Sequence, residues 1–301
     1  FADAGFAVAI AETDADRRAG LPEAIARGHA AMATAGLARG AAAGAAGRVS
    51  VVADVRAAAE GAAMVVEAGP ERLEAKRTLF AAILAAAPPD APVATASSAI
   101  TASAILDRPE DRARALVAHP VNPPTVVRVL EIVPTPETDP AAVARAVALF
   151  SQAGFSPTVL GREMPGFVFN RLQGAVLREA YRLVAEGVVD AEGVDRLVRD
   201  GLGPRWALSG PFETAELNTP GGIVAHADRM GPAYRAMGEA RGERDCAWSP
   251  ALVATVERQR RAVLPAEAIP ARVRWREDAL ARLVAARDRL LAATPDDARE
   301  E

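Results

Sequence analysis

The chain has 301 residues, half of them apolar, and its 35 Lys and Arg against 39 Asp and Glu give a formal net charge of −4. This composition allows one large domain or two ordinary ones, and it excludes the broad basic field typical of nucleic-acid-binding proteins. The sequence shows no signal peptide and no apolar run of transmembrane length, and its single cysteine, Cys246, excludes an internal disulfide. We therefore expect a soluble, cytoplasmic protein without nucleic-acid or membrane partners.

The first segment predicts part of a dinucleotide-binding unit. Residues 1–5 are typical of the tail of a helix that ends at Gly5, and the apolar run 6–11 predicts a strand that ends at Glu12. In a βαβ unit, an acid at this place bonds the adenosine ribose hydroxyls and favours NAD over NADP. Glu12 can also be an ordinary exposed acid at a strand end.

The strand and Gly-rich phosphate loop that open such a unit would precede residue 1. We therefore expect the chain to begin inside the unit, with roughly 20–25 further residues needed to complete it.

Strands and helices then alternate as far as Gly161. Predicted helices cover 14–43, with an interruption at 20–22, then 71–87 and a segment from Pro140 capped by Asp139; predicted strands are 48–52, 63–68, 93–96, 116–118 and 156–160. Alternation of this kind predicts a parallel sheet covered by helices on both faces.

One histidine ends a strand in this half. The apolar run 115–118 stops at His119, and Pro120 biases His119 towards an extended conformation. In the next run, 126–133, Glu131 falls on the same face as Val133, and both faces of the run look largely buried.

A buried carboxylate requires a partner, and His119 is the obvious candidate for Glu131. A carboxylate behind a histidine orients the ring and favours its protonated form, which is how a general base is built. The alternative is a satisfied structural histidine.

Beyond Pro165 the pattern is helical. Residues 166–186 carry an apolar stripe, Gly187 fits the end of that helix, and Asp190 fits the cap of the next one, which ends near Gly201. The basic cluster 258–261 is interpreted as a solvated helix face. The fold class is therefore α/β, a Rossmann-type doubly wound sheet over 1–161 followed by an all-helical C-terminal domain over 162–301.

Taken together, these pieces resemble the 3-hydroxyacyl-CoA dehydrogenase superfamily, and within it the lambda-crystallin and L-gulonate 3-dehydrogenase branch. The resemblance covers essentially the whole chain. It rests on VVEAGPERLEAKRTLF (65–80), TASS (95–98), AHPVNPPTVVRVLEIVPTPET (118–138), PGFVFNRLQGAVLREAYRLVAEGVV (165–189) and GLGPRWALSGPFETAELN (201–218).

The resemblance implies roles for individual residues. His119 matches the general base, Glu131 its partner, and Ser97 and Asn170 the residues that bond substrate oxygens. The cofactor-side matches are Glu12, Glu71, Lys76, Ser97 and Asn122.

Some of these roles have alternatives. The alanine-rich context leaves Ser98 as an alternative to Ser97, and the alternative role for the two serines is to cap the following helix. Asn170 can be a structural amide, and Glu71 with Lys76 can be an ordinary surface pair.

The resemblance implies an NAD-dependent dehydrogenase that acts on an L-3-hydroxy acid, and a homodimer built by the helical domain. The expected substrate is a free acid such as L-gulonate, with Arg205 as the candidate for binding its carboxylate. The alternatives are an L-3-hydroxyacyl-CoA dehydrogenase of fatty-acid metabolism and a non-catalytic, lambda-crystallin-like NAD-binding protein. No metal site is predicted.

Overall fold

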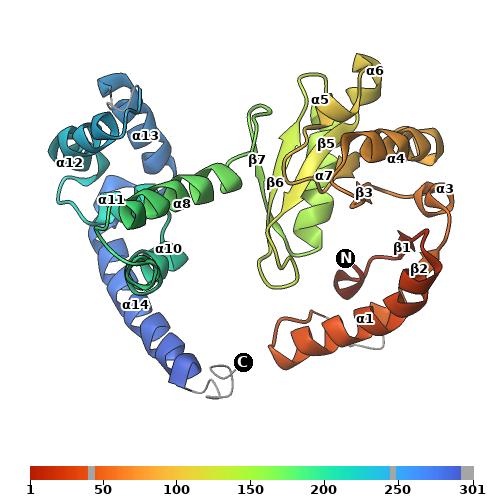
Figure 1. Ribbon diagram of the computed structural model, residues 1–301, viewed down its shortest axis with the longest axis horizontal. Helices are drawn as coiled ribbons and strands as arrows, with labels where there is room; N and C mark the ends of the chain where they lie inside the picture. The colour runs from red at the N-terminus through yellow and green to blue at the C-terminus, as the bar shows by residue number, and fades with distance from the viewer. Residues whose placement is uncertain (40–44, 245–248, 293–301) are drawn as a thin grey trace. The chain divides into compact units, whose positions relative to one another are not determined.

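The computed structural model describes residues 1–39, 45–244 and 249–292, and the chain divides into two compact units, Phe1–Leu177 and Arg178–Glu301. Within the described residues, all strands belong to the first unit, and the second unit is helical (Figure 1). The expected α/β fold followed by a helical part is therefore confirmed. Cys246 lies outside the described residues.

The first unit holds two sheets. A parallel pair consists of β1 (Val8–Ala11) and β2 (Val49–Val52). The larger sheet has the order β3-β4-β5-β6-β7, formed by β3 (Val65–Glu67), β4 (Val93–Thr95), β5 (Ala115–Pro120), β6 (Val129–Pro134) and β7 (Ser156–Val159). Strands β3, β4 and β5 are parallel, whereas β6 is antiparallel to β5, because the connection between these two strands contains no helix that would return the chain.

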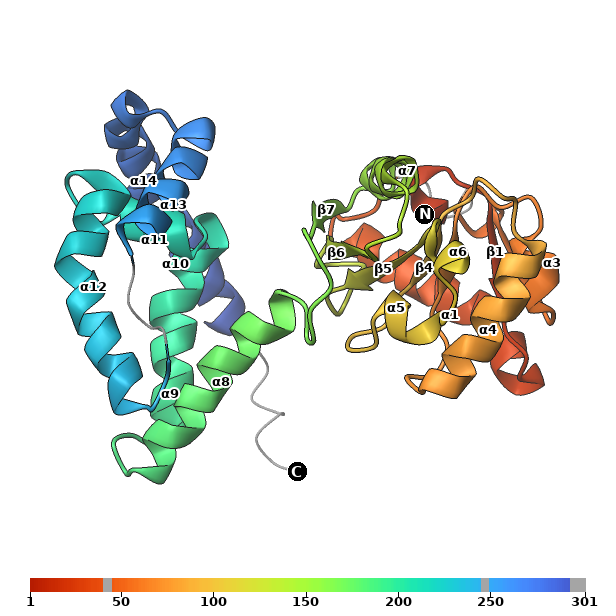
Figure 2. The same ribbon diagram turned by 90° about the horizontal axis from the view of Figure 1, so that it is seen from above.

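Helices cover both faces of the larger sheet, as Figure 2 shows with α7 on one side and α4 and α5 on the other. Alternate residues of β5 point to opposite faces, so Ala115 packs in a cluster with Phe80 of α4, and Leu116 packs in a cluster with Phe150 of α7. The helices of this unit are α1 (Ala15–Thr34), α3 (Val55–Ala59), α4 (Leu73–Ala86), α5 (Ala102–Ile105), α6 (Pro109–Arg112) and α7 (Pro140–Gln152).

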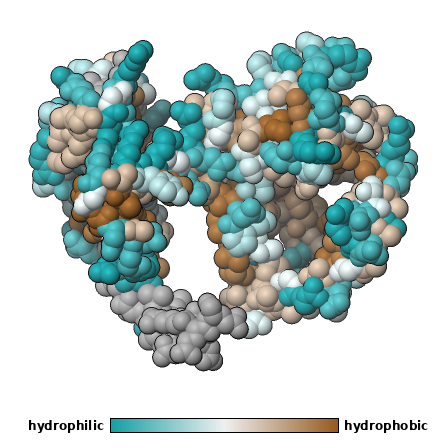
Figure 3. All heavy atoms as spheres, in the orientation of Figure 1, coloured by the Kyte–Doolittle hydropathy of each residue, from teal (hydrophilic) through white to brown (hydrophobic). Residues whose placement is uncertain are grey.

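Three predictions in this unit are wrong. The helix predicted over 14–43 ends as α1 at Thr34, and Gly36 just past its end has a positive φ of 69°. Helix α1 is not interrupted at residues 20–22, because Asp14 caps its start and the many helix-forming residues around Pro22 offset a penalty of about 3 kcal/mol. The second strand of the histidine pair begins at Val129 rather than at 126, because the backbone of Val126 and Val127 turns back onto the Pro123 carbonyl. Both valines are exposed, as are Val129 of β6 and Val159 of β7. Figure 3 shows hydrophobic surface in this part of the first unit.

The second unit is built from helices, and α8 starts in the first unit. Asp190 caps α9 by accepting from the backbone N–H of Gly193, as predicted. None of the helices in the described ranges combines the length and hydrophobicity needed to cross a membrane. The helices are α8 (Phe169–Ala185), α9 (Ala191–Leu197), a π-turn (Val198–Leu202), α10 (Gly203–Leu208), α11 (Pro211–Leu217), α12 (Gly222–Ala240), α13 (Pro250–Val263), a 3₁₀ turn (Ala266–Ala268) and α14 (Ile269–Ala292).

Only half of the basic cluster on α13 is a solvated face, because Arg258 and Gln259 are exposed but Arg260 and Arg261 are not. Nη2 of Arg260 lies 2.8 Å from Oε2 of Glu216, and Arg261 pairs with the other oxygen of the same carboxylate. Glu216 is fully buried on α11. The solvated-face prediction is therefore wrong for Arg260 and Arg261, because the spacing of arginines on one helix does not show that a second helix brings a buried carboxylate to them.

Candidate functional site

His119 and Glu131 face each other across the antiparallel pair β5–β6, where they occupy directly opposite positions in the register. Nδ1 of His119 lies 2.8 Å from Oε2 of Glu131, and both residues are buried. Nε2 of His119 has no hydrogen-bond partner among the residues that the structure describes. The pairing expected from the sequence therefore leaves one ring nitrogen free for a ligand.

The second oxygen of Glu131 fixes the start of α8. Oε1 accepts hydrogen bonds from the backbone N–H groups of Val168 (2.7 Å) and Phe169 (3.0 Å). A carboxylate at a helix N-terminus satisfies amides that have no partner within the helix and interacts favourably with the helix dipole. Glu131 thus connects the histidine to the first turn of α8.

Phe167, in the turn before α8, packs against the histidine. It is fully buried, and its ring centroid lies 5.5 Å from that of His119. Its φ of 47° is in the left-handed region, where a residue other than glycine is uncommon. Sequence reasoning missed this residue, and the only signal for it is its place between Gly166 and the apolar stripe of α8.

Ser97 follows β4 and is buried. Its Oγ donates to Oε1 of Glu71 at 2.5 Å and accepts from the backbone N–H of Ile100 at 2.7 Å. A serine hydroxyl has a single proton to donate, so in this arrangement that proton is committed to Glu71. Donation to a substrate oxygen requires this hydrogen bond to be exchanged.

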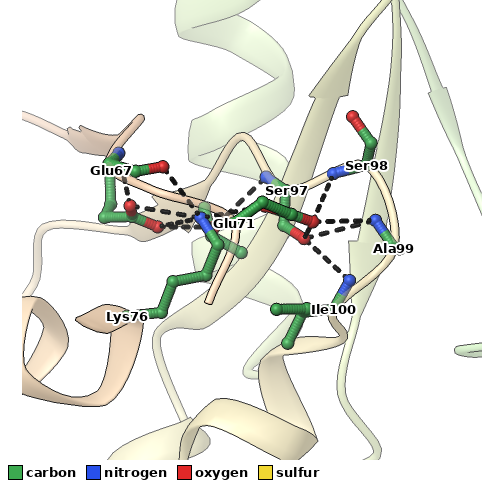
Figure 4. Close-up of polar contacts among 9 residues, drawn as sticks. Glu67, Glu71, Lys76, Ser97, Ser98, Ala99 and Ile100 are labelled. Atoms are coloured by element: carbon green, nitrogen blue, oxygen red, sulfur yellow. Dashed lines mark hydrogen bonds and ion pairs between the residues drawn. The ribbon is translucent and has the colours of Figure 1, made fainter. Parts of the chain in front are cut away.

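Lys76 lies between two carboxylates, as Figure 4 shows. Its Nζ is 3.1 Å from Oε2 of Glu67 and 3.2 Å from Oε2 of Glu71, and the residue is 1 % exposed. Partial burial acts to raise the pKa of Glu71, but the Ser97 hydroxyl and the Lys76 ammonium outweigh it and hold that pKa below its usual value. Lys76 is therefore not part of an ordinary surface pair.

Asn170 in α8 reaches the loop that follows β4. Its Nδ2 donates to the carbonyl oxygen of Ser98 at 3.0 Å, although 72 residues separate the two in sequence. The structure thus brings Asn170 beside the predicted site loop, whereas Asn122, just past β5, is exposed. The catalytic and cofactor roles of these residues remain predictions.

Glu12 ends β1 as expected. It accepts from Nε and Nη2 of Arg17 at 3.1 and 3.2 Å, and its side chain is 23 % exposed. The partly exposed carboxylates of Glu12 and Glu71 both follow strand ends, and their chemistry fits acceptors for the ribose hydroxyls of a dinucleotide.

Arg205 lies in α10 of the second unit and is half-buried. Its backbone carbonyl accepts from the N–H and the hydroxyl of Ser209. Its assignment to a substrate carboxylate remains a prediction. Within the described ranges, no three His, Cys, Asp or Glu side chains gather as metal ligands.

Comparison with known proteins gives matches along most of the chain. The chain is 46 % identical over 183 residues to the lambda-crystallin homolog of Bos taurus, which covers 61 % of this chain and 57 % of that protein. It is 41 % identical over 176 residues to a 3-hydroxyacyl-CoA dehydrogenase of Gibberella moniliformis, covering 57 % and 55 %. It is 36 % identical over 189 residues to the L-carnitine dehydrogenase of Streptomyces coelicolor, covering 62 % and 59 %. The matched stretch thus spans little more than half of each relative.

Two family models cover the two parts of the fold. Residues 1–164 match the NAD-binding domain of 3-hydroxyacyl-CoA dehydrogenase, and residues 166–263 match its C-terminal domain. The first match supports NAD as the cofactor, in agreement with the carboxylates at the strand ends. Together with the relatives, these matches show that the chain belongs to the 3-hydroxyacyl-CoA dehydrogenase family, in its lambda-crystallin branch.

Proposed function

We propose that the protein is an NAD-dependent oxidoreductase that interconverts an L-3-hydroxy acid and its 3-oxo form, with His119 as the general base. The observation that carries this proposal is the free Nε2 of a buried histidine whose Nδ1 pairs with Glu131. Nε2 removes the hydroxyl proton of the substrate, and the adjacent carboxylate stabilises the positive charge that forms on the ring. The hydride acceptor is the nicotinamide of bound NAD, whose chemistry belongs to the cofactor.

Ser97 and Asn170 supply the remaining polar groups of this proposal. Both lie at the loop after β4, where Asn170 already bonds the Ser98 carbonyl. For Ser97 to donate to a substrate oxygen, its hydroxyl must exchange its present acceptor, Glu71. Asn170 needs no such exchange, because the second N–H of its amide is not used by the Ser98 carbonyl. Substrate binding and reorientation of the Ser97 hydroxyl are therefore coupled in the proposal.

The proposed substrate is a free 3-hydroxy acid such as L-gulonate, with Arg205 binding its carboxylate. The similarity to a relative named for L-carnitine, itself a free 3-hydroxy acid, supports this class. The second candidate is a 3-hydroxyacyl-CoA, which the similarity to the Gibberella moniliformis enzyme supports.

We also propose that the protein is a cytoplasmic homodimer. The exposed apolar side chains of Leu172 and Val176 on α8 suit a subunit interface, and light scattering coupled to gel filtration measures the assembly.

The test follows NADH by absorbance with the full-length protein, its formation with L-gulonate or L-carnitine and its consumption with acetoacetyl-CoA. We expect turnover with a free acid and a loss of about 10²–10⁴-fold in kcat for His119→Ala. His226→Ala, in the second unit, is the matched control and keeps wild-type turnover.

Turnover with acetoacetyl-CoA alone would contradict the free-acid proposal. NADH binding without turnover of any of these substrates would favour the non-catalytic alternative. Near-wild-type turnover by His119→Ala would remove the histidine from the mechanism.

A further inference from the structure

Glu67, at the end of β3, is a buried carboxylate surrounded by donors. It is 4 % exposed, and it accepts from the Gly69 N–H at 2.6 Å, from Oγ1 of Thr95 at 2.7 Å and from Nζ of Lys76. These bonds replace the water that a carboxylate loses on burial. None of the roles considered above uses this residue.

Two chains of contacts lead from Glu67 to Ser97. The shorter one passes through Thr95, whose hydroxyl donates to Glu67 and accepts from the backbone N–H of Ser97 at 3.2 Å. Because a threonine hydroxyl has one proton, its donation to Glu67 turns a lone pair towards Ser97. This route holds the backbone of Ser97.

The longer route holds the side chain of Ser97. Lys76 bridges Glu67 and Glu71, and Oε1 of Glu71 accepts from the Ser97 hydroxyl and from the backbone N–H groups of Ser98 and Ala99, both at 3.2 Å (Figure 4). Glu71 is held in place by Lys76, and Lys76 is held in place by Glu67.

We propose that Glu67 is a positioning residue that sets the orientation of Ser97 for the dehydrogenase reaction. Both routes start on the carboxylate of Glu67 and end on two different atoms of Ser97. Neutralising Glu67 would leave the buried Lys76 with Glu71 alone and would release the Thr95 hydroxyl. The inference rests on the proposed function, in which Ser97 donates to a substrate oxygen.

The experiment is a double-mutant cycle on the full-length protein with Glu67→Gln, Ser97→Ala and the pair combined. We expect Glu67→Gln to lower kcat roughly 10- to 100-fold, because a small misplacement of a positioning group is costly. In the Ser97→Ala background, Glu67→Gln should cost almost nothing further. Thr95→Val should repeat part of the loss, and Thr95→Ser, which keeps the hydroxyl, should restore activity.

The matched control is Thr138→Val. It removes a buried hydrogen bond to the Ala115 carbonyl, at the end of β5 opposite His119. This variant should lower Tm without changing kcat. If the fold-loss in kcat of the double variant equals the product of the losses of Glu67→Gln and Ser97→Ala, the inference is overturned. A kcat for Glu67→Gln no lower than that of Thr138→Val would overturn it as well.

A second readout does not need turnover. Hydrogen exchange at the backbone amides of Ser98, Ala99 and Ile100 should accelerate in Glu67→Gln and Thr95→Val but not in Thr138→Val, since these amides bond to Glu71 and to the Ser97 hydroxyl. Unchanged exchange at these amides would overturn the inference. Accelerated exchange in an enzyme that turns over none of the substrates would support the positioning network and reject the proposed reaction.

Discussion

At the end of β1, the carboxylate of Glu12 accepts two hydrogen bonds from Arg17. The acid repels a 2′-phosphate, but the arginine beside it is the group that accommodates one in NADP-dependent relatives of this fold. Glu12→Ala should therefore free Arg17 and shift the ratio of Kd values for NADH and NADPH by roughly 10-fold or more towards NADPH.

The ratio is measured by fluorescence titration of the full-length protein with each cofactor. Glu12→Ala combined with Arg17→Ala is the control, and it should lose most of the gain in NADPH binding. An unchanged ratio in Glu12→Ala would show that neither side chain meets the adenosine ribose.

Among individual residues, the sequence predicts some side-chain pairs and not others. The pairing of His119 with Glu131 is predictable, because two strands joined by a short connection run antiparallel and bring residues on either side of the turn together. The burial of Lys76 is not predictable, because it depends on Glu67 and Thr95, which two other strands supply. Local patterns identify a lysine on a helix but not the carboxylate that covers it.

Among the elements, the turn before α8 combines strain with packing. Gly166 and Phe167 have φ values of 77° and 47°, and this path aims the next two backbone N–H groups at Glu131. A left-handed residue with a Cβ costs about 1–2 kcal/mol, which the burial of the Phe167 ring beside His119 offsets.

Phe167→Ala should lower the free energy of unfolding by about 3–5 kcal/mol, because it leaves a cavity where the ring was fully buried. Urea denaturation followed by circular dichroism measures this loss. Phe169→Ala, two residues later and 38 % exposed, is the control and should lose much less. Similar losses in both variants would contradict the packing role of Phe167.

Most elements follow from local sequence, since apolar runs, caps and glycine stops identify nearly all of the strands and long helices. The errors arise where one local signal overrides another. Pro22 does not interrupt α1. Val126 and Val127 are not part of the strand, because their backbone N–H groups donate to the Pro123 carbonyl and form a turn. In both places the signals for helix and strand are present, but neighbouring residues decide the outcome.

For the whole molecule, each unit has its own buried charged cluster. In the second unit, Glu216 is fully buried and pairs with Arg260 and Arg261, which are 15 % and 26 % exposed. Removing the negative charge leaves Arg261 without this carboxylate and leaves Arg260 with Glu213, 3.8 Å away. Glu216→Ala should therefore destabilise this unit by roughly 2–4 kcal/mol, less than for a fully buried pair because water still reaches the arginines.

The three tryptophans allow this effect to be assigned to one unit, because Trp206, Trp248 and Trp275 all lie beyond residue 178. Tryptophan fluorescence therefore reports unfolding of the second unit, and its urea midpoint should fall in Glu216→Ala. Glu192→Ala, on the exposed surface of the same unit, is the control and should leave the midpoint unchanged. A midpoint equal to wild type in Glu216→Ala would contradict the structural role of this cluster.

At this scale the division into an α/β part and a helical part is predictable, because the change of pattern is sharp. The position of the boundary is harder to predict. The sequence places it after 161, the family models meet between 164 and 166, and the compact units separate after Leu177. Hydrogen bonds join the start of α8 to Glu131 and to the Ser98 carbonyl of the first unit. The boundary at 161 therefore stays a prediction.

The two carboxylate oxygens of Glu131 have different partners, so replacing one of them with an NH₂ group affects the histidine and the helix differently. A glutamine there offers one acceptor oxygen and one NH₂ group, and the two backbone N–H groups of α8 favour the oxygen on their side. The NH₂ group then faces Nδ1 of His119, which must become an acceptor, and the neutral ring carries its proton on Nε2. Glu131→Gln should therefore be folded but trapped in the wrong tautomer, with kcat lowered at least roughly 100-fold. Nitrogen-15 chemical shifts of the imidazole identify that tautomer directly, and a proton found on Nδ1 in the variant would contradict the trap.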